Sequence, residues 1–200
     1  MIAIIDYGAG NIFSVKNALD YLGVENKLTA DKNEICAADE IILPGVGAFP
    51  WAMKMLRDSG LVDTIREAAR KKPFLGICLG MQLIFDKGYE FEETDGLRLI
   101  GGKVEKIDRK DMIIPHMGWN ELEINRDCPI LKGLPEHPYV YFVHSYAAVC
   151  DEANVSAYCD YGGKITALVH DGAYVYGAQF HPEKSGEVGL QMLRNFAELA

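Results

Sequence analysis

The sequence lacks the features that would place it in a membrane, on a secretory route or on a nucleic acid. No stretch approaches the roughly 18–20 consecutive apolar residues of a membrane-spanning helix. The N-terminal segment carries neither a basic region nor a small-residue cleavage site, so we expect no signal peptide. Basic residues are scarce: 20 lysines and arginines stand against 29 acidic residues, and the net charge of −9 argues against a nucleic-acid surface.

The sequence also gives no support for disulfide bonds or for a metal bound by cysteines. The five cysteines form an odd set without a C-x-x-C pair, at positions 36, 78, 128, 150 and 159. This pattern favours neither a disulfide framework nor a zinc site, and a reducing cytoplasm is the expected location. A P-loop is absent, and the G-x-G of Gly8 and Gly10 lacks the third glycine of a dinucleotide fingerprint, because position 13 is Phe. We therefore expect no metal and no cofactor.

Apolar residues make up 49% of the chain and fall into segments of two kinds. In the first half, short apolar runs alternate with segments of helical periodicity. There we expect strands at 2–5, 24–28, 41–43 and 73–78, and helices at 12–22, 51–57 and 61–72. From residue 97 onward β-rich segments dominate. There we expect strands at 104–107, 121–124, 139–143, 155–158, 165–169 and 174–180, and a closing helix at 188–199.

These patterns predict an α/β fold. Alternating strands and helices favour an open, mostly parallel central sheet with helices on both faces, and the β-rich second half is expected to extend it with antiparallel strands. No linker-like segment divides the chain, so we expect a single domain over residues 1–200. In open sheets of this kind, sites lie at the carboxyl ends of the strands, which directs attention to the residues that follow each apolar run.

Cys78 stands at a turn between a buried strand and a helix. The helix continues through Gln82, and glycines lie two residues before and two after the cysteine, at Gly76 and Gly80. This is the G-x-nucleophile-x-G elbow, in which strained backbone dihedrals at the nucleophile leave no room for flanking side chains. The pattern makes Cys78 a candidate nucleophile; a buried cysteine in an ordinary strand-to-helix turn is the alternative.

Two further segments follow buried strands and could serve a cysteine nucleophile. In the loop at 44–49, Gly45 and Gly47 let backbone N–H groups turn toward a ligand. Among the five histidines, His181 stands out because it directly follows an apolar strand. Glu183, two residues on, can accept from its imidazole and stabilise the imidazolium. A plain loop and a surface turn are the alternatives for these two segments.

Together these segments resemble the class I, triad-type glutamine amidotransferases. The matching residues are Asp6-Tyr7-Gly8-Ala9-Gly10-Asn11, Pro44-Gly45-Val46-Gly47-Ala48-Phe49, Gly76-Ile77-Cys78-Leu79-Gly80-Met81-Gln82 and His181-Pro182-Glu183-Lys184-Ser185. The resemblance spans almost the whole chain. The first two segments and Pro115-His116-Met117-Gly118-Trp119-Asn120 are typical of a subgroup in which a separate glutaminase chain serves a cyclase. The chain begins at the first strand and ends at the last helix, so we expect no fused synthase domain.

The resemblance implies a flavodoxin-like fold, a glutaminase reaction and a role for each matching residue. Cys78 attacks the side-chain amide carbon of glutamine, His181 moves the protons and Glu183 orients the histidine. A glutamyl thioester forms, and water releases glutamate after ammonia has left. The implied oxyanion donors are the N–H groups of Leu79 and of the peptide between Val46 and Gly47. The residues implied to hold glutamine are Gly45, Gln82, Glu90, His144, Ser145 and Tyr146; a capped strand end is the alternative for His144, and an exposed acid for Glu90.

The resemblance also implies a partner. Ammonia would lose its nucleophilicity by protonation in water, so such glutaminases pass it directly to a synthase, in this subgroup a (β/α)8-barrel cyclase bound as a heterodimer. The residues that match the docking face are Met117, Trp119, Tyr141 and Lys184; core aromatics and a surface lysine are the alternative. The isolated chain is implied to be nearly inactive, because the partner must set the donor at 46–47. We expect neither a nucleic-acid partner nor a membrane.

Three other functions stay open at this level. Another ammonia-donating glutaminase, serving pyridoxal phosphate, purine or anthranilate synthesis, would share the elbow. A cysteine hydrolase or peptidase on the same fold would act without a partner. A non-enzymatic, flavodoxin-like binding module is disfavoured, because a degenerate site should have lost one of the three residues Cys78, His181 and Glu183.

Overall fold

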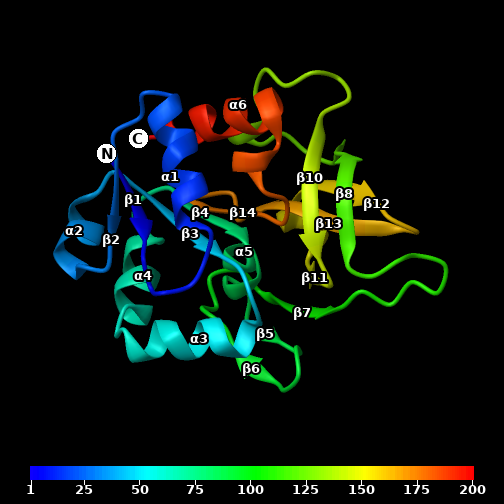
Figure 1. Ribbon diagram of the computed structural model, residues 1–200, viewed down its shortest axis with the longest axis horizontal. Coiled ribbons are helices and arrows are strands. Elements are labelled where there is room, and N and C mark those ends of the chain that lie inside the picture. Colours follow the sequence, from blue (N-terminus) through cyan, green and yellow to red (C-terminus); the bar gives the residue numbers. More distant parts are fainter.

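A computed structural model describes residues 1–200 (Figure 1). Up to Leu83 the strands are separated by helices, and from there to Ala178 the chain is mostly β. The helices are α1 (Ile12–Tyr21), α2 (Lys32–Ala37), α3 (Phe49–Asp58), α4 (Val62–Ala68), α5 (Leu79–Leu83) and α6 (Gly186–Ala197). The strands are β1 (Ile2–Ile5), β2 (Asn26–Thr29), β3 (Glu40–Gly45), β4 (Phe74–Cys78), β5 (Lys87–Gly88), β6 (Thr94–Asp95), β7 (Gly102–Lys106), β8 (His116–Glu121), β9 (Glu123–Ile124), β10 (Tyr139–His144), β11 (Tyr146–Cys150), β12 (Val155–Asp160), β13 (Lys164–His170) and β14 (Val175–Ala178). Short 3₁₀ turns lie at Pro129–Leu131, Glu152–Asn154 and Pro182–Lys184.

Eight of the strands form one central sheet. Their order is β2-β1-β3-β4-β14-β13-β12-β9. Strands β2 to β14 in this order pair parallel, and β13, β12 and β9 continue the sheet antiparallel. The predicted fold class is therefore confirmed: a mostly parallel open sheet extended by antiparallel strands.

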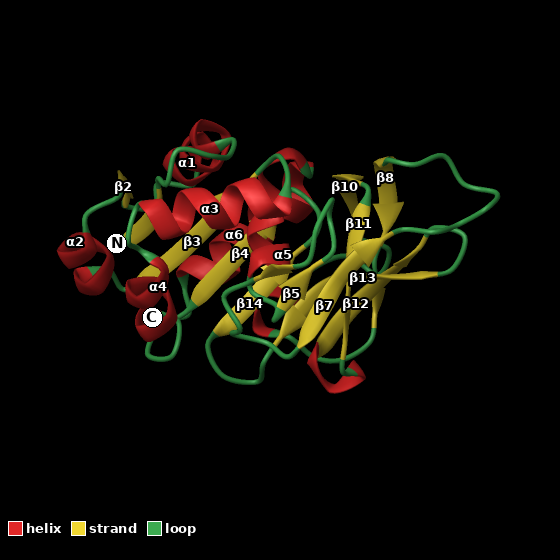
Figure 2. Cartoon of the chain, turned by 90° about the horizontal axis from the view of Figure 1, so that it is seen from below, coloured by secondary structure: helices red, strands yellow, loops and turns green.

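Helices cover both faces of the parallel half (Figures 1 and 2). On one face, Leu19 of α1 and Phe196 of α6 share an apolar cluster with Ile4. On the other face, Met53 of α3 joins Ile5 in a second cluster with residues of α2, α4 and α5. Neighbouring side chains of β1 enter different clusters because side chains alternate along a strand. All four residues of β1 are buried, which explains why such strands appear in the sequence as unbroken apolar runs.

Part of the second half lies outside the central sheet, contrary to the expectation from sequence. Strands β10 and β8 form an antiparallel pair, and β11, β7, β5 and β6 form a separate four-stranded sheet. The sequence predicts no strand at β8, because only His116 among its residues is buried and no alternating apolar pattern results. It also predicts no helix at α2, whose six residues bury only Ile35 and whose N-terminus is capped by the Asp31 carboxylate.

The backbones of α5 and β3 approach each other closely at Gly80. A Cβ placed on Gly80 would lie 1.8 Å from the carbonyl oxygen of Leu43, and one on Gly76 would lie 2.6 Å from the carbonyl oxygen of Gly80. Both obstructing atoms belong to the backbone, so neither can move aside as a flexible side chain would. The two glycines that flank Cys78 are therefore required by close backbone approach.

Replacing Gly80 by alanine should destabilise the protein, even though alanine favours helices. We expect Gly80→Ala to lower the free energy of unfolding by about 3 kcal/mol through overpacking, and the melting temperature by roughly 10 °C. Thermal unfolding followed by circular dichroism measures the change. Gly101→Ala is the matched control, because the atom nearest to its Cβ is an Asp86 oxygen 3.9 Å away. Equal melting temperatures for the two variants would contradict the argument.

Candidate active site

Cys78 occupies a strained position at the end of β4. Its backbone has φ 54° and ψ −110°, a left-handed conformation that residues other than glycine rarely adopt. The strand is held on both sides, by β3 and by β14, and α5 begins at the next residue, Leu79. The chain thus turns from strand to helix within one residue and places the sulfur at the carboxyl edge of the sheet. This is the geometry that the elbow pattern predicts.

The sulfur of Cys78 lies at a cavity of about 370 Å³. This cavity brings together most of the residues singled out from the sequence: Val46, Gly47, Cys78, Leu79, Gln82, Glu90, His144, Ser145, Tyr146 and His181. Of the other predicted site residues, Gly45 pairs with Cys78 in the β3–β4 ladder and Glu183 contacts the far side of the His181 ring. Residues from β3, β4, α5, β10, β11 and the segment after β14 therefore converge at one place.

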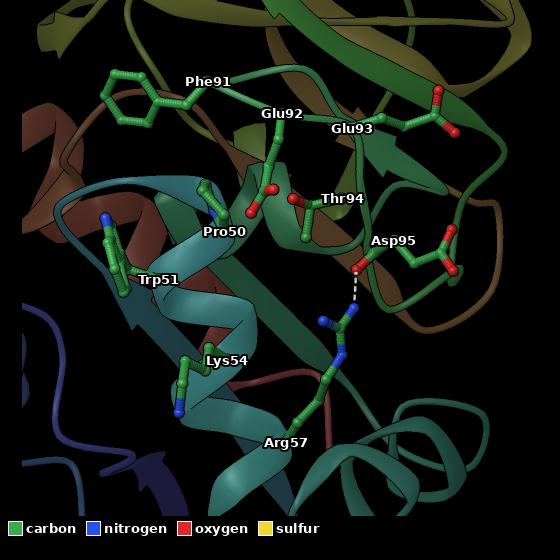
Figure 3. A pocket seen from close by; sticks show the side chains of 9 residues that line it. All are labelled: Pro50, Trp51, Lys54, Arg57, Phe91, Glu92, Glu93, Thr94 and Asp95. Carbon is green, nitrogen blue, oxygen red and sulfur yellow. Dashed lines mark hydrogen bonds between the residues drawn. The ribbon is translucent and has the colours of Figure 1, made fainter.

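A wider cleft of about 800 Å³ lies between α3 and the segment at 91–95 (Figure 3). Side chains of both charges line it, and Arg57 donates to the backbone carbonyl of Asp95 at 2.7 Å. None of the residues predicted from the sequence as functional lines this cleft. The smaller cavity at Cys78 is the one in which nucleophile and titratable groups meet.

His181 and Glu183 form a buried pair beside the cavity. Nδ1 of His181 lies 2.8 Å from Oε1 of Glu183, and the side chains are 3% and 1% exposed. Burial by itself lowers the pKa of His181, but the neighbouring Cys78 sulfur and the hydrogen-bonded Glu183 carboxylate outweigh it and raise that pKa to about 9. Nε2 of His181 is buried without a hydrogen-bond partner of its own. The ring is therefore oriented by a carboxylate and keeps one nitrogen free for proton transfer.

His144, also in the cavity wall, has the opposite character. Its Nδ1 lies 2.8 Å from the Tyr146 carbonyl oxygen, which can only accept, so Nδ1 carries the proton. Its Nε2 lies 3.0 Å from Nδ1 of His116 and accepts from it. Burial lowers the pKa of His144 to about 4, so the ring is neutral at physiological pH. His144 is thus suited to shape the cavity, and His181 is the histidine suited to acid–base chemistry.

Gln82 is oriented by two acceptors. Its Nε2 donates to the carbonyl oxygen of Tyr146 and to Oε1 of Gln179, both at 3.0 Å. Gln179 is fully buried and its Nε2 lies 3.9 Å from the Cys78 sulfur. Gln179 is not among the functional residues predicted from the sequence. The available signal was a polar residue in an otherwise apolar strand, two positions before His181.

Glu90 has a contact that the sequence does not indicate. Its Oε2 accepts from the backbone N–H of Phe49 at 2.8 Å, at the start of α3. The carboxylate thereby links the cavity wall to the helix that follows the loop at 44–47. Within that loop, Gly47 has φ 105°, a backbone conformation that favours glycine, and no atom lies within 4 Å of the place that a Cβ would take.

The four residues matched to a docking face lie near the rim of the cavity. Met117 and Trp119 lie on β8, opposite Val143 and Tyr141 of β10, and the Trp119 and Tyr141 rings meet edge to face. Met117 is 60% and Trp119 53% exposed, and Lys184 is also exposed. A core position for these aromatics, the alternative from sequence, is therefore wrong for Trp119.

No group of three or more histidine, cysteine, aspartate or glutamate side chains is arranged to hold a metal ion. None of the helices combines the length and apolar character that crossing a membrane requires.

Comparison with known proteins agrees with the resemblance seen in the motifs. The family described as glutamine amidotransferase class-I matches residues 3–199. A relative from Bacillus cereus (strain G9842), named imidazole glycerol phosphate synthase subunit HisH, is 51% identical over 197 residues, which are 98% of this chain and 93% of the relative. A protein of the same name from Listeria monocytogenes serotype 4a (strain HCC23) is 49% identical over 201 residues, 100% of this chain and 96% of the relative.

Solved structures show the same fold at lower identity. A protein described as a glutamine amidotransferase has a TM-score of 0.77 at 23% identity, covering 100% of this chain and 98% of its own. A structure described as PurLQS from Thermotoga maritima has a TM-score of 0.75 at 23% identity, covering 98% of this chain and 96% of its own. At such identities the likeness shows the fold alone.

Removing either partner of His181 should lower its pKa. Because the Cys78 thiolate and the Glu183 carboxylate stabilise the imidazolium, Glu183→Gln and Cys78→Ser should each move the pKa of His181 down from about 9 toward the ordinary value of about 6.5. NMR titration of isotope-labelled histidine measures the shift, with the exposed His137 as internal reference. An unchanged midpoint in both variants would contradict the assigned cause.

Proposed function

Because the chain belongs to the glutamine amidotransferase class-I family, we propose that it serves as the glutaminase subunit of an imidazole glycerol phosphate synthase, in histidine biosynthesis. The observation that carries this function is the likeness to the two relatives of that name, at about half identity over nearly the full length of both chains. The same likeness disfavours a glutaminase of another pathway. A cytoplasmic location stays a prediction, based on the use of free cysteines.

The reaction begins at the Cys78 sulfur. Nε2 of His181, which has no other hydrogen-bond partner, takes the thiol proton, and the thiolate attacks the side-chain amide carbon of glutamine. Glu183, 2.8 Å from Nδ1, holds the ring in one orientation and stabilises the imidazolium that forms. The raised pKa of His181 supports this step, because it reflects an imidazolium stabilised by these two groups.

The tetrahedral intermediate carries a negative oxygen that needs hydrogen-bond donors. Val46, Gly47 and Leu79 line the cavity, and we assign the N–H of Leu79 and that of the peptide between Val46 and Gly47 as these donors. A donor of this kind contributes on the order of 3 kcal/mol. Collapse of the intermediate breaks the C–N bond, and the leaving nitrogen takes the proton from His181. Water then adds to the thioester and regenerates the thiol. The net reaction consumes glutamine and water and produces glutamate and ammonia.

The amino-acid end of glutamine lies against the other cavity residues in this proposal. Gln82 has both N–H groups committed, so it offers its oxygen to the substrate. Glu90 uses one oxygen on Phe49 and retains the other for the ammonium group. The remaining contacts come from Gly45, His144, Ser145 and Tyr146.

The chain works as one subunit of a synthase, and we assign its partner as a (β/α)8-barrel cyclase bound as a heterodimer. This cyclase adds the nitrogen to a phosphoribulosyl aminoimidazole intermediate and forms imidazole glycerol phosphate and an aminoimidazole carboxamide ribotide. Direct transfer keeps ammonia unprotonated and nucleophilic. The exposed Met117 and Trp119, with Tyr141 and Lys184, supply an aromatic and basic face beside the cavity for this contact. Aromatic residues of this kind dominate binding energy at interfaces.

The Cys78→Ala variant should lose glutaminase activity by at least about a thousandfold, because no other group can form the thioester. The ammonia-dependent reaction of the partner should stay intact in the same complex. Coupled assays of glutamate formation and of the cyclase product measure both activities. Full glutamine hydrolysis by this variant would overturn the assignment of Cys78.

Truncation of Trp119 should weaken the heterodimer. We expect Trp119→Ala to raise the dissociation constant for the cyclase at least about tenfold, since aromatic side chains that become buried at an interface are common hot spots. Isothermal titration calorimetry measures it. Tyr21→Ala is the control, because Tyr21 is 77% exposed but lies at the far end of α1 from the carboxyl edge of the sheet. Equal dissociation constants for the two variants would argue for another docking face.

A further inference from the structure

Gln179 is a buried side chain in direct reach of the nucleophile, and none of the roles described so far uses it. It follows β14 immediately, and its backbone N–H donates to the Ala167 carbonyl at 2.9 Å, which holds the residue against β13. Its side chain is 0% exposed. Both polar atoms of the amide have partners: Oε1 accepts from Gln82, and Nε2 points to the sulfur of Cys78 at 3.9 Å.

The direction of this amide is determined by a backbone carbonyl. The Tyr146 carbonyl can only accept, so Gln82 must present its NH₂ group to that oxygen. The second N–H of the same group points at Gln179, so the oxygen of Gln179 must accept that hydrogen bond. The NH₂ group of Gln179 is left to face Cys78. A flipped amide would set two NH₂ groups against each other and an oxygen against the sulfur, leaving buried donors unpaired.

The sulfur has a second hydrogen-bond contact, and this one is to an acceptor. The Cys78 thiol donates to the carbonyl oxygen of Val143 at 4.0 Å, a contact that is possible only while the proton is present. Once the proton has moved to Nε2 of His181, the contact with Gln179 is the one that gains strength, because hydrogen bonds to an ionised acceptor are stronger than those to a neutral one. Gln179 keeps its own protons throughout.

We propose that the side-chain amide of Gln179 donates a hydrogen bond to the Cys78 thiolate and, oriented by Gln82 and the Tyr146 carbonyl, is a further catalytic residue of this site. The proposal rests on the proposed role of Cys78 as nucleophile. It also gives Gln82 a second role. Gln82 borders the bound glutamine in the proposed function, and its amide also orients the Gln179 amide that faces the sulfur. Replacing either Gln82 or Gln179 would therefore disturb the same N–H donor, the one that faces the sulfur.

The test is the pH dependence of Cys78 alkylation by iodoacetamide, measured on the full chain by mass spectrometry of the peptide that contains Cys78. The titratable groups that face the sulfur are His181 with Glu183 behind it, Tyr7, Glu90, and His144 with His116. These groups are the same in the wild type and in variants of Gln179. Gln179→Met adds no titratable group to this set, so a shift of its alkylation midpoint reports the loss of the amide itself.

Two variants separate the donor from the bulk of the side chain. Gln179→Met replaces the amide by an apolar chain of similar length and adds no charge, whereas Gln179→Glu keeps an oxygen for Gln82, removes the N–H groups and adds a carboxyl group beside the sulfur. Both should move the alkylation midpoint upward by about one pH unit, and in complex with the cyclase both should lower kcat by roughly tenfold to a hundredfold. KM should change by less than about threefold, because the amide acts on the sulfur and not on the bound amino-acid end.

Asn195→Asp is the matched control for loss of a buried amide. Asn195 donates to the carbonyl oxygens of Ile130 and Lys132, at 3.1 and 2.7 Å, and contacts no residue of the cavity. It should lower stability without moving the alkylation midpoint. Midpoints of both Gln179 variants equal to that of the wild type would overturn the proposal. Alkylation does not depend on glutamine turnover, so a failure of the proposed function, seen as full hydrolysis by Cys78→Ala, is a separate result.

Discussion

The close approach of α5 to β3 is the constraint on which the candidate site depends. Gly80 brings the helix so near to the Leu43 carbonyl that no Cβ fits between them, and the chain at Cys78 must therefore turn from strand to helix within one residue. A left-handed conformation costs a residue other than glycine of order 1–3 kcal/mol. Pairing of β4 with β3 and β14 maintains it. The sulfur is thereby held at the edge of the sheet, between the loop that follows β3 and the His181 segment that follows β14.

Around this sulfur, hydrogen-bond direction decides what each side chain can do. The Tyr146 carbonyl accepts from both His144 and Gln82, so one atom determines the tautomer of a histidine and the orientation of an amide. The pKa values of His144 and His181 move apart, to about 4 and about 9. Both rings are buried, but the Nδ1 of His144 faces a neutral carbonyl and that of His181 a carboxylate. The site therefore contains one histidine that stays neutral and one that can hold a proton.

The parts of this arrangement that were predictable share a physical basis. Strands buried on both faces appear as apolar runs, and Cys78 and His181 were found because each stands at or directly after such a run. Strand β8 was not predictable, because pairing with β10 and not burial of an apolar face makes it a strand. The contact of Glu90 with Phe49 was hidden for a related reason: a capping carboxylate 41 positions away leaves no local pattern.

The sequence by itself determined the strands and most of the helices of the first half, the elbow and the pairing of His181 with Glu183, because each depends on residues within a few positions of one another. The tertiary structure decided which other groups meet them. Gln179 reaches Cys78 across 101 positions, and Gln82 reaches Tyr146 across 64. Such contacts follow no period of strand or helix, and they form only when β14 is inserted between β4 and β13. The Tyr146 carbonyl can only accept, and this determines the orientation of the Gln82 amide and, through it, that of Gln179. The constraint exists only once the folded backbone has placed this carbonyl beside Gln82.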